Sequence, residues 1–128
     1  MSKRIVSAIL CLALVVAMAV PAFAATVFFT STVDGYKCVG SGYVTKTYAK
    51  ATFEGTPYSG GMIPPAETCN CSSTMNVFSG SGRLITSVSR AGNTYCTSSY
   101  SSSSGAIART VSMFSFQSRS WGGYTLYA

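Results

Sequence analysis

Two different patterns of hydrophobic residues divide this chain. From Ile5 to Val20 the residues are apolar with the single exception of Ser7, and Pro21 follows at once. After position 24, apolar and polar residues follow one another in short runs separated by glycine, serine, asparagine and proline. A long unbroken apolar run predicts a helical segment, whereas short alternating runs between turn residues predict half-buried β-strands.

The apolar run has the surroundings of an export signal. Lys3 and Arg4 precede it, and the small residues of Ala22-Phe23-Ala24 follow it. This order is typical of a secretory signal peptide, so we expect residues 1–24 to be removed by cleavage after Ala24. An uncleaved membrane anchor is the alternative, but a spanning helix needs about 20 apolar residues. We therefore expect residues 25–128 to form one secreted β domain with no stable membrane span.

Eight segments of residues 25–128 suit β-strands. They are Thr26–Val33, Tyr36–Val39, Tyr43–Phe53, Thr74–Phe78, Arg83–Ser89, Thr94–Tyr100, Ala106–Gln117 and Trp121–Tyr127. Their short lengths and regular spacing favour an all-β fold, an antiparallel β-sandwich of about seven or eight strands, with a small β-barrel as the alternative. The abundance of serine, threonine, glycine and tyrosine in this part of the chain disfavours helices.

Glycine and proline mark the expected connections. Asp34-Gly35 predicts a two-residue hairpin turn, and the Gly-Ser-Gly triplets at 40–42 and 80–82 predict two more turns. Gly122-Gly123 predicts a β-bulge inside the last strand. Residues 54–72 hold three prolines and three glycines, and this composition predicts a long loop, a kind of segment that is often functional.

Four cysteines remain after the expected cleavage, namely Cys38, Cys69, Cys71 and Cys96. An even number in a small exported chain predicts two disulfides. A bridge between Cys69 and Cys71 would close a strained ring, so Cys38 pairs with one of them and Cys96 with the other, and both connectivities stay open. A zinc site is disfavoured because paired zinc ligands usually have two to four residues between them. We expect no metal and no cofactor.

Catalysis has few groups to draw on. The chain has no histidine, and its only carboxylate side chains are Asp34, Glu54 and Glu67. Without histidine, Ser-His-Asp and Cys-His machinery is impossible, and so few carboxylates leave little for a glycosidase pair. We therefore expect no enzyme activity, and the sequence contains no nucleic-acid-binding motif.

Basic and aromatic residues supply the candidate binding groups. Without Lys3 and Arg4, seven basic residues stand against three acidic ones, so the surface should be positive. Lys46, Tyr48 and Lys50 are expected on one face of a strand, and Trp121 adds an aromatic ring that can stack on sugars. The alternative is a solvated strand face on which lysine only discourages aggregation.

These features favour a small, non-catalytic, disulfide-stabilised secreted protein that binds extracellular or cell-envelope material, either an anionic polymer or a glycan. A bacteriocin-like antimicrobial protein is one alternative, although no amphipathic helix is present to attack membranes. A protease inhibitor acting through residues 62–66 is another, because Met62, Ile63, Pro64 and Pro65 form an apolar, proline-stiffened segment, and a preorganised loop binds at lower cost.

Overall fold

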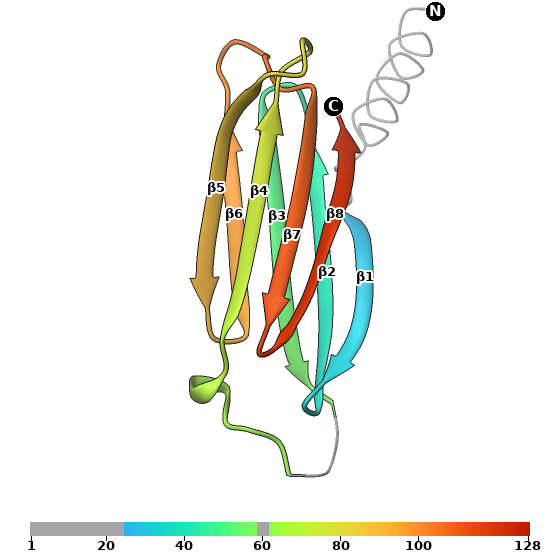
Figure 1. Cartoon of the computed structure of the whole chain (residues 1–128), viewed down its shortest axis with the longest axis vertical. Coiled ribbons are helices and arrows are strands. Elements are labelled where there is room, and N and C mark those ends of the chain that lie inside the picture. The colour runs from blue at the N-terminus through green and yellow to red at the C-terminus, as the bar shows by residue number, and fades with distance from the viewer. Residues whose placement is uncertain (1–24, 59–61) are drawn as a thin grey trace, which may run out of the picture.

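The chain folds into two packed antiparallel sheets of four strands each (Figure 1). The computed structural model describes residues 25–58 and 62–128. Sheet A has the order β1-β2-β3-β6 and sheet B the order β5-β4-β7-β8. The strands are β1 Thr26–Val33, β2 Tyr36–Val44, β3 Tyr48–Pro57, β4 Cys71–Phe78, β5 Leu84–Gly92, β6 Tyr95–Ser101, β7 Arg109–Phe116 and β8 Arg119–Tyr127. The predicted β-sandwich is thus confirmed.

The expected signal peptide lies outside the described residues. Within residues 25–58 and 62–128, no helix is both long enough and apolar enough to cross a membrane. The only helical element described is the single 3₁₀ turn η1, Ala66–Thr68.

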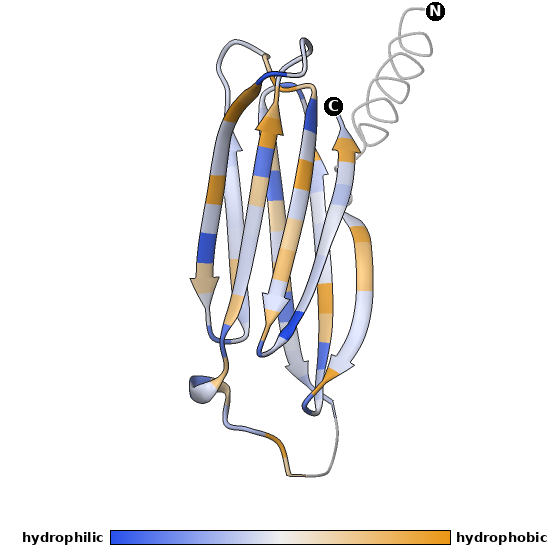
Figure 2. Ribbon diagram, viewed as in Figure 1, coloured by the Kyte–Doolittle hydropathy of each residue, from blue (hydrophilic) through white to orange (hydrophobic). Residues whose placement is uncertain are grey.

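Strict alternation of side chains builds the core between the sheets. In β4 the buried residues are Cys71, Ser73, Met75 and Val77, and each residue between them is half-buried. Figure 2 shows the resulting mixture of apolar and polar residues along the strands. β7 lies between β4 and β8, and its inward residues Phe114 and Phe116 are buried. This period of two is what a strand requires when one of its faces is packed and the other is wet.

Buried hydroxyl groups join the two sheets across this core. Ser98 of β6 donates its hydroxyl hydrogen to the carbonyl of Ser73 at 2.6 Å. Ser73 of β4 in turn donates to the carbonyl of Ala51 in β3 at 3.1 Å. Both serines are fully buried, so these bonds satisfy polar groups that have no access to water.

Aromatic rings close the side of the sandwich between the edge strands β1 and β8. The Phe29 ring stacks on Trp121 with the centroids 4.4 Å apart, and Phe28 stacks on Tyr124 at 5.0 Å. Phe114 lies behind them, 5.6 Å from Phe29. These offset stacks fill the gap with large apolar groups whose geometry is itself favourable.

The expected long strand Tyr43–Phe53 is wrong. Tyr43 and Val44 end β2, and the chain reverses at residues 45–47 before β3 begins. The Thr45 hydroxyl oxygen accepts hydrogen bonds from the backbone N–H groups of Thr47 at 3.3 Å and Tyr48 at 3.0 Å. A threonine side chain can close a turn in this way without glycine or proline.

The turn expected at 40–42 is also wrong, because these residues lie inside β2. The two glycines face inward, where rings from β1 leave no room for a side chain. A Cβ atom at Gly40 would lie 2.1 Å from the Phe29 ring, and one at Gly42 would lie 3.0 Å from the Phe28 ring. Glycine here serves close packing rather than a reversal of the chain.

The other predicted connections agree more closely with the structure. Asp34 and Gly35 adopt positive φ angles of 50° and 82° between β1 and β2, as a two-residue hairpin requires. The ladder between β7 and β8 shifts its register between Ser112 and Phe114, opposite Gly122 and Gly123, which is the predicted bulge. The long loop is shorter than expected because β3 continues to Pro57 and β4 begins at Cys71.

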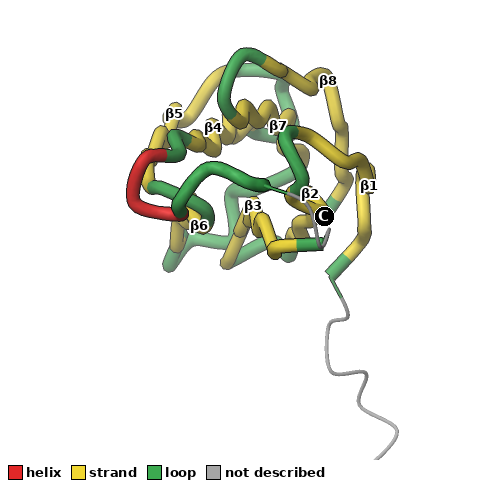
Figure 3. The backbone as a smooth tube through the Cα atoms, turned by 90° about the horizontal axis from the view of Figure 1, so that it is seen from below, coloured by secondary structure: helices red, strands yellow, loops and turns green. Residues whose placement is uncertain are grey.

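The strand connections gather at two ends of the sandwich. The upper end in Figure 1 carries residues 45–47, 79–83 and 102–108, and the lower end carries residues 34–35, 58–70, 93–94 and 117–118. At the upper end, the N–H groups of Ile107 and Ala108 donate to the carbonyls of Lys46 and Phe78. At the lower end, the segment from Met62 to Asn70 passes across the opening between the sheets (Figure 3).

Candidate functional site

The four residues singled out as binding candidates do not form one site. Tyr48 and Lys50 lie on the outer face of sheet A, Lys46 lies in the turn at the upper end, and Trp121 packs inward from β8. Lys46 is therefore not in register with the other two, because the strand that would have aligned them is interrupted at residues 45–47.

Three basic residues lie in separate segments of the upper end instead. Lys46 belongs to the turn before β3, Arg83 to the loop before β5, and Arg109 begins β7. The Arg109 guanidinium lies over the Phe78 ring, 4.4 Å from its centroid. This cation–π contact holds the charge in place, and a guanidinium group can donate several N–H bonds to an anion.

Hollows lie among these loops. One, of about 490 Å³, is lined by Lys46, Ser79, Gly80, Gly105, Ala106, Ile107, Ala108 and Ala128. Another, of about 300 Å³, is lined by Ser79, Gly80, Gly82, Ala108, Arg109 and Tyr127. Because Ser79, Gly80 and Ala108 line both, the hollows adjoin, with Lys46 on one side and Arg109 on the other.

The acidic side chains lie away from this end. Asp34 is in the β1–β2 turn, Glu67 is in η1, and Glu54 pairs with Val39 and with Tyr95, the first residue of β6. All three thus occupy the lower half of the sandwich. The basic residues of that half are Lys37, Arg90 and Arg119. Positive and negative charges balance there, whereas the upper end carries three cationic side chains and neither aspartate nor glutamate.

A smaller aromatic cluster occupies the outer face of sheet A. The Tyr43 and Tyr48 rings lie 5.5 Å apart, and Lys50 is the cross-strand partner of Tyr43. Burial raises the pKa of Tyr43, and the neighbouring Tyr48 adds to the rise. The two rings and the ammonium group face solvent together, which suits stacking against a sugar or a cation–π contact.

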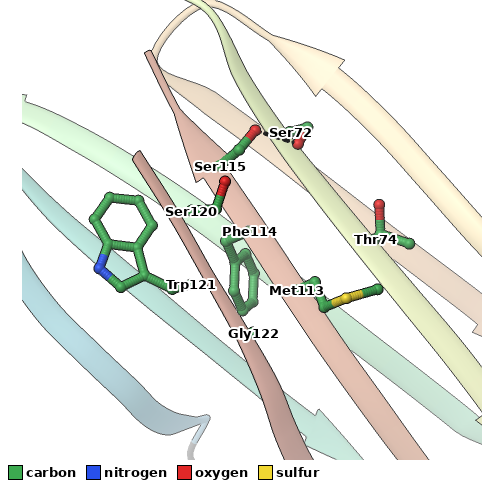
Figure 4. A pocket seen from close by; sticks show the side chains of 8 residues that line it. All are labelled: Ser72, Thr74, Met113, Phe114, Ser115, Ser120, Trp121 and Gly122. Carbon is green, nitrogen blue, oxygen red and sulfur yellow. Dashed lines mark hydrogen bonds between the residues drawn. The ribbon is translucent and has the colours of Figure 1, made fainter. Parts of the chain in front are cut away.

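The outer face of sheet B carries an open pocket of about 360 Å³ (Figure 4). It is lined by Ser72, Thr74, Met113, Phe114, Ser115, Ser120, Trp121 and Gly122. The hydroxyls of Ser72 and Ser115 hydrogen-bond to each other across β4 and β7. The lining therefore combines several hydroxyl groups with the apolar side chain of Met113 and contains no charged residue.

The bulge in β8 shapes this pocket. Gly122 lies beside Met113, and a Cβ atom there would be 3.0 Å from the Met113 Cγ. Trp121 pairs with Phe114 and extends to the inner side of the strand. Figure 4 accordingly shows Trp121 and Met113 on opposite sides of the β8 ribbon. Trp121 is therefore part of the packing between β1 and β8 rather than an exposed platform.

The proline-stiffened segment is tied to the lower end. The Tyr36 hydroxyl donates a hydrogen bond to the Pro64 carbonyl at 2.6 Å, and Ile63 is half-buried against Gly35. Pro65 precedes η1, and its carbonyl accepts a hydrogen bond from the Thr68 hydroxyl at 2.7 Å. The Met62 side chain is fully exposed. The segment thus caps the sandwich, and a single large apolar side chain projects from it.

The four cysteines are buried thiols in the structure, and no pair lies at S–S bonding distance. Burial raises the pKa of Cys38 to about 11 and also raises the pKa values of Cys71 and Cys96. Burial likewise raises the pKa of the Tyr36 hydroxyl, and a hydrogen bond with Cys69 adds to that rise. Folded, reduced protein should therefore hold Cys38, Cys71 and Cys96 as unreactive thiols near neutral pH.

Metal-ligating side chains do not gather in the described part of the chain: no three histidine, cysteine, aspartate or glutamate residues are placed to hold an ion. Sequence reasoning missed the grouping of Lys46, Arg83 and Arg109, because they are far apart in the chain and each lies at the end of a different strand. Comparison with protein-family models, with curated proteins and with solved structures gives no match to this chain.

Proposed function

We propose that this protein is an exported, non-catalytic binding module that holds an anionic polymer of the cell envelope or its surroundings at the upper end of the sandwich. The observation that carries the proposal is the separation of charge along the molecule. Lys46 and Arg109 line adjoining hollows at one end, where the loop before β5 also carries Arg83, and the aspartate and glutamate side chains lie in the other half.

The chemistry of this end suits phosphate, sulfate or carboxylate groups repeated along a chain. Arginine presents several N–H donors and lysine a compact charge, so both bind anions well. A polymer carries several anions, so contacts that are weak singly add together. The adjoining hollows, which share Ser79 and Gly80 in their lining, offer space for a segment of a linear polymer.

Cosedimentation with a matched pair of solids tests the proposal. Phosphocellulose and plain cellulose share one backbone and differ in charge. We expect residues 25–128 to pellet with phosphocellulose at low salt, to stay in solution with plain cellulose, and to be released as salt rises, since salt screens exposed charges. Equal behaviour with both solids would refute binding through charge.

A neutral glycan is the second candidate ligand, and the pocket on sheet B is the observation that favours it. Its hydroxyl groups can exchange hydrogen bonds with sugar hydroxyls, and Met113 offers an apolar surface to a ring face. Such binding would persist in high salt, because no charged side chain lines the pocket.

A pair of arginine variants tests the second candidate. Thr74→Arg fills the pocket, whereas Ser87→Arg adds the same charge on β5, outside the pocket lining. If the pocket binds glycan, Thr74→Arg loses salt-resistant binding and Ser87→Arg keeps it. Equal binding by the two variants would remove the pocket from consideration.

A further inference from the structure

Two of the buried sulfurs already touch. The Sγ atoms of Cys71 and Cys96 lie 3.3 Å apart, between β4 of sheet B and β6 of sheet A. Cys71 is the first residue of β4 and Cys96 the second of β6, so both lie at the lower end. A small side-chain rotation would bring these sulfurs to the length of a disulfide, which is about 2.05 Å.

The other two thiols share a second neighbourhood around Tyr36. The Cys38 thiol donates to the carbonyl oxygen of Tyr36 at 3.6 Å, and the Cys69 thiol lies beside the hydroxyl of the same residue. Cys69 also donates to the Pro65 carbonyl at 3.5 Å. Both residues are buried, so each can form a disulfide only with a cysteine that packs close to it.

We infer that oxidation of this protein forms one bridge between Cys71 and Cys96 and a second between Cys38 and Cys69. The first would cross the core and join the two sheets. The second would fasten the segment from Met62 to Asn70 to β2. Together they would close the end of the sandwich opposite the proposed polymer site, so the inference stands independently of any ligand.

The bond chemistry needs one external oxidant, a small or protein-borne disulfide. A cysteine thiolate attacks that disulfide, gives a mixed disulfide and releases one thiol. The partner cysteine then displaces the second thiol and completes the bridge. Each bridge thus costs two S–H bonds and one external S–S bond, and two electrons and two protons pass to the oxidant. Because folding buries all four sulfurs, we expect the bridges to form while the chain folds.

A single substitution allows the disulfide pairing to be determined by peptide mapping. Asn70 separates Cys69 from Cys71, its side chain is exposed, and only its backbone groups hydrogen-bond, to Gln117. In Asn70→Lys, trypsin places each cysteine in a different peptide: 38–46, 51–70, 71–83 and 91–109. The variant is refolded from reductant with oxidised and reduced glutathione, then denatured, digested without reduction and analysed by mass spectrometry.

The inferred pairing predicts two linked products, 38–46 with 51–70 and 71–83 with 91–109. The opposite pairing would give 38–46 with 71–83 and 51–70 with 91–109, and would overturn the inference. Recovery of all four peptides unlinked would overturn it as well.

Double variants check the result without relying on Asn70→Lys. The variant Cys71→Ser/Cys96→Ser keeps the inferred partners Cys38 and Cys69, and should show no free thiol after refolding. The variant Cys38→Ser/Cys71→Ser keeps Cys69 and Cys96, which are not inferred partners, and should retain two titratable thiols as a monomer. Near-ultraviolet circular dichroism reports whether each variant is folded. Two free thiols in folded Cys71→Ser/Cys96→Ser, or none in folded Cys38→Ser/Cys71→Ser, would contradict the inference.

Discussion

A glycine inside β2 allows the aromatic rings of β1 to lie close to the β2 backbone. Gly40 is buried, and the Phe29 ring occupies the space where its side chain would be. Phe29 in turn stacks on Trp121, so one missing methyl group permits the contact that closes the side of the sandwich. Gly40 therefore acts through packing and not through backbone freedom, because its φ angle is not positive.

We predict that Gly40→Ala destabilises the fold by about 1–3 kcal/mol, because the added methyl group overpacks the site and displaces Phe29. Urea unfolding followed by tryptophan fluorescence measures the change. Gly80→Ala is the matched control, since nothing lies within 4 Å of a Cβ atom there. Equal stability of Gly40→Ala and Gly80→Ala would show that the Phe29 ring can move aside without a loss of stability.

The buried thiol of Cys38 makes the stability of the reduced protein depend on pH. Its pKa is about 11 in the folded chain and about 9 when unfolded, so above pH 9 the unfolded state loses a proton that the folded state keeps. The contribution to stability is complete below pH 9 and is lost as the pH rises to 11.

We therefore predict that urea resistance of the reduced protein falls between pH 9 and pH 11. Cys38→Ser lacks this thiol but keeps the tyrosines and lysines, so its urea midpoint should fall less over the same interval. Parallel loss in the two proteins would indicate that Cys38 ionises equally in both states.

At the scale of elements, alternation made the strands predictable, whereas the connection between β2 and β3 was not. β4 and β7 show the period of two plainly, and Asp34-Gly35 signals its own turn. The reversal at residues 45–47 depends on hydrogen bonds to the Thr45 hydroxyl. Threonine is also a common strand residue, so its presence did not mark a turn.

Tyr36 supplies a central contact to the segment from Met62 to Asn70. Tyr36→Phe keeps the edge-to-face contact with Phe116 at 5.5 Å but removes the hydrogen bond to Pro64. A hydrogen bond of this kind is worth about 1 kcal/mol, which corresponds to about a fivefold change in an equilibrium constant.

We predict that chymotrypsin cleaves Tyr36→Phe after Tyr58 about fivefold faster than the parent, because local opening precedes cleavage. Gel electrophoresis of timed digests measures the rate. Tyr127→Phe, which alters an exposed tyrosine, should be cleaved like the parent. Unchanged cleavage of Tyr36→Phe would mean that other contacts hold the segment.

At the scale of the whole molecule, composition and strand spacing predicted the sandwich, but not the site. A surplus of basic residues is visible in the sequence, and their placement is not. Lys46, Arg83 and Arg109 share one end of the molecule only because β2, β4 and the connection after β6 all end at the upper end. Trp121 was predicted to be an exposed ring that stacks on sugars. In the structure it packs against Phe29 of β1 instead.

The separation of charge is the central claim, and two matched triple variants test it. One removes the charges of the upper end, Lys46→Gln/Arg83→Gln/Arg109→Gln, and the other those of the lower half, Lys37→Gln/Arg90→Gln/Arg119→Gln. Each loses one lysine and two arginines, and in each one arginine lies over an aromatic ring, Phe78 or Trp121. The two variants thus have the same net charge and differ in which end carries the loss.

The measurement is the affinity of each variant for soluble dextran sulfate at low salt, with uncharged dextran as the blank. We predict that the upper-end variant binds at least tenfold more weakly than the parent, about 1.4 kcal/mol or more, and that the lower-half variant loses less than threefold. Equal losses in the two variants would contradict the account, because binding would then follow net charge and not the charges gathered at the upper end.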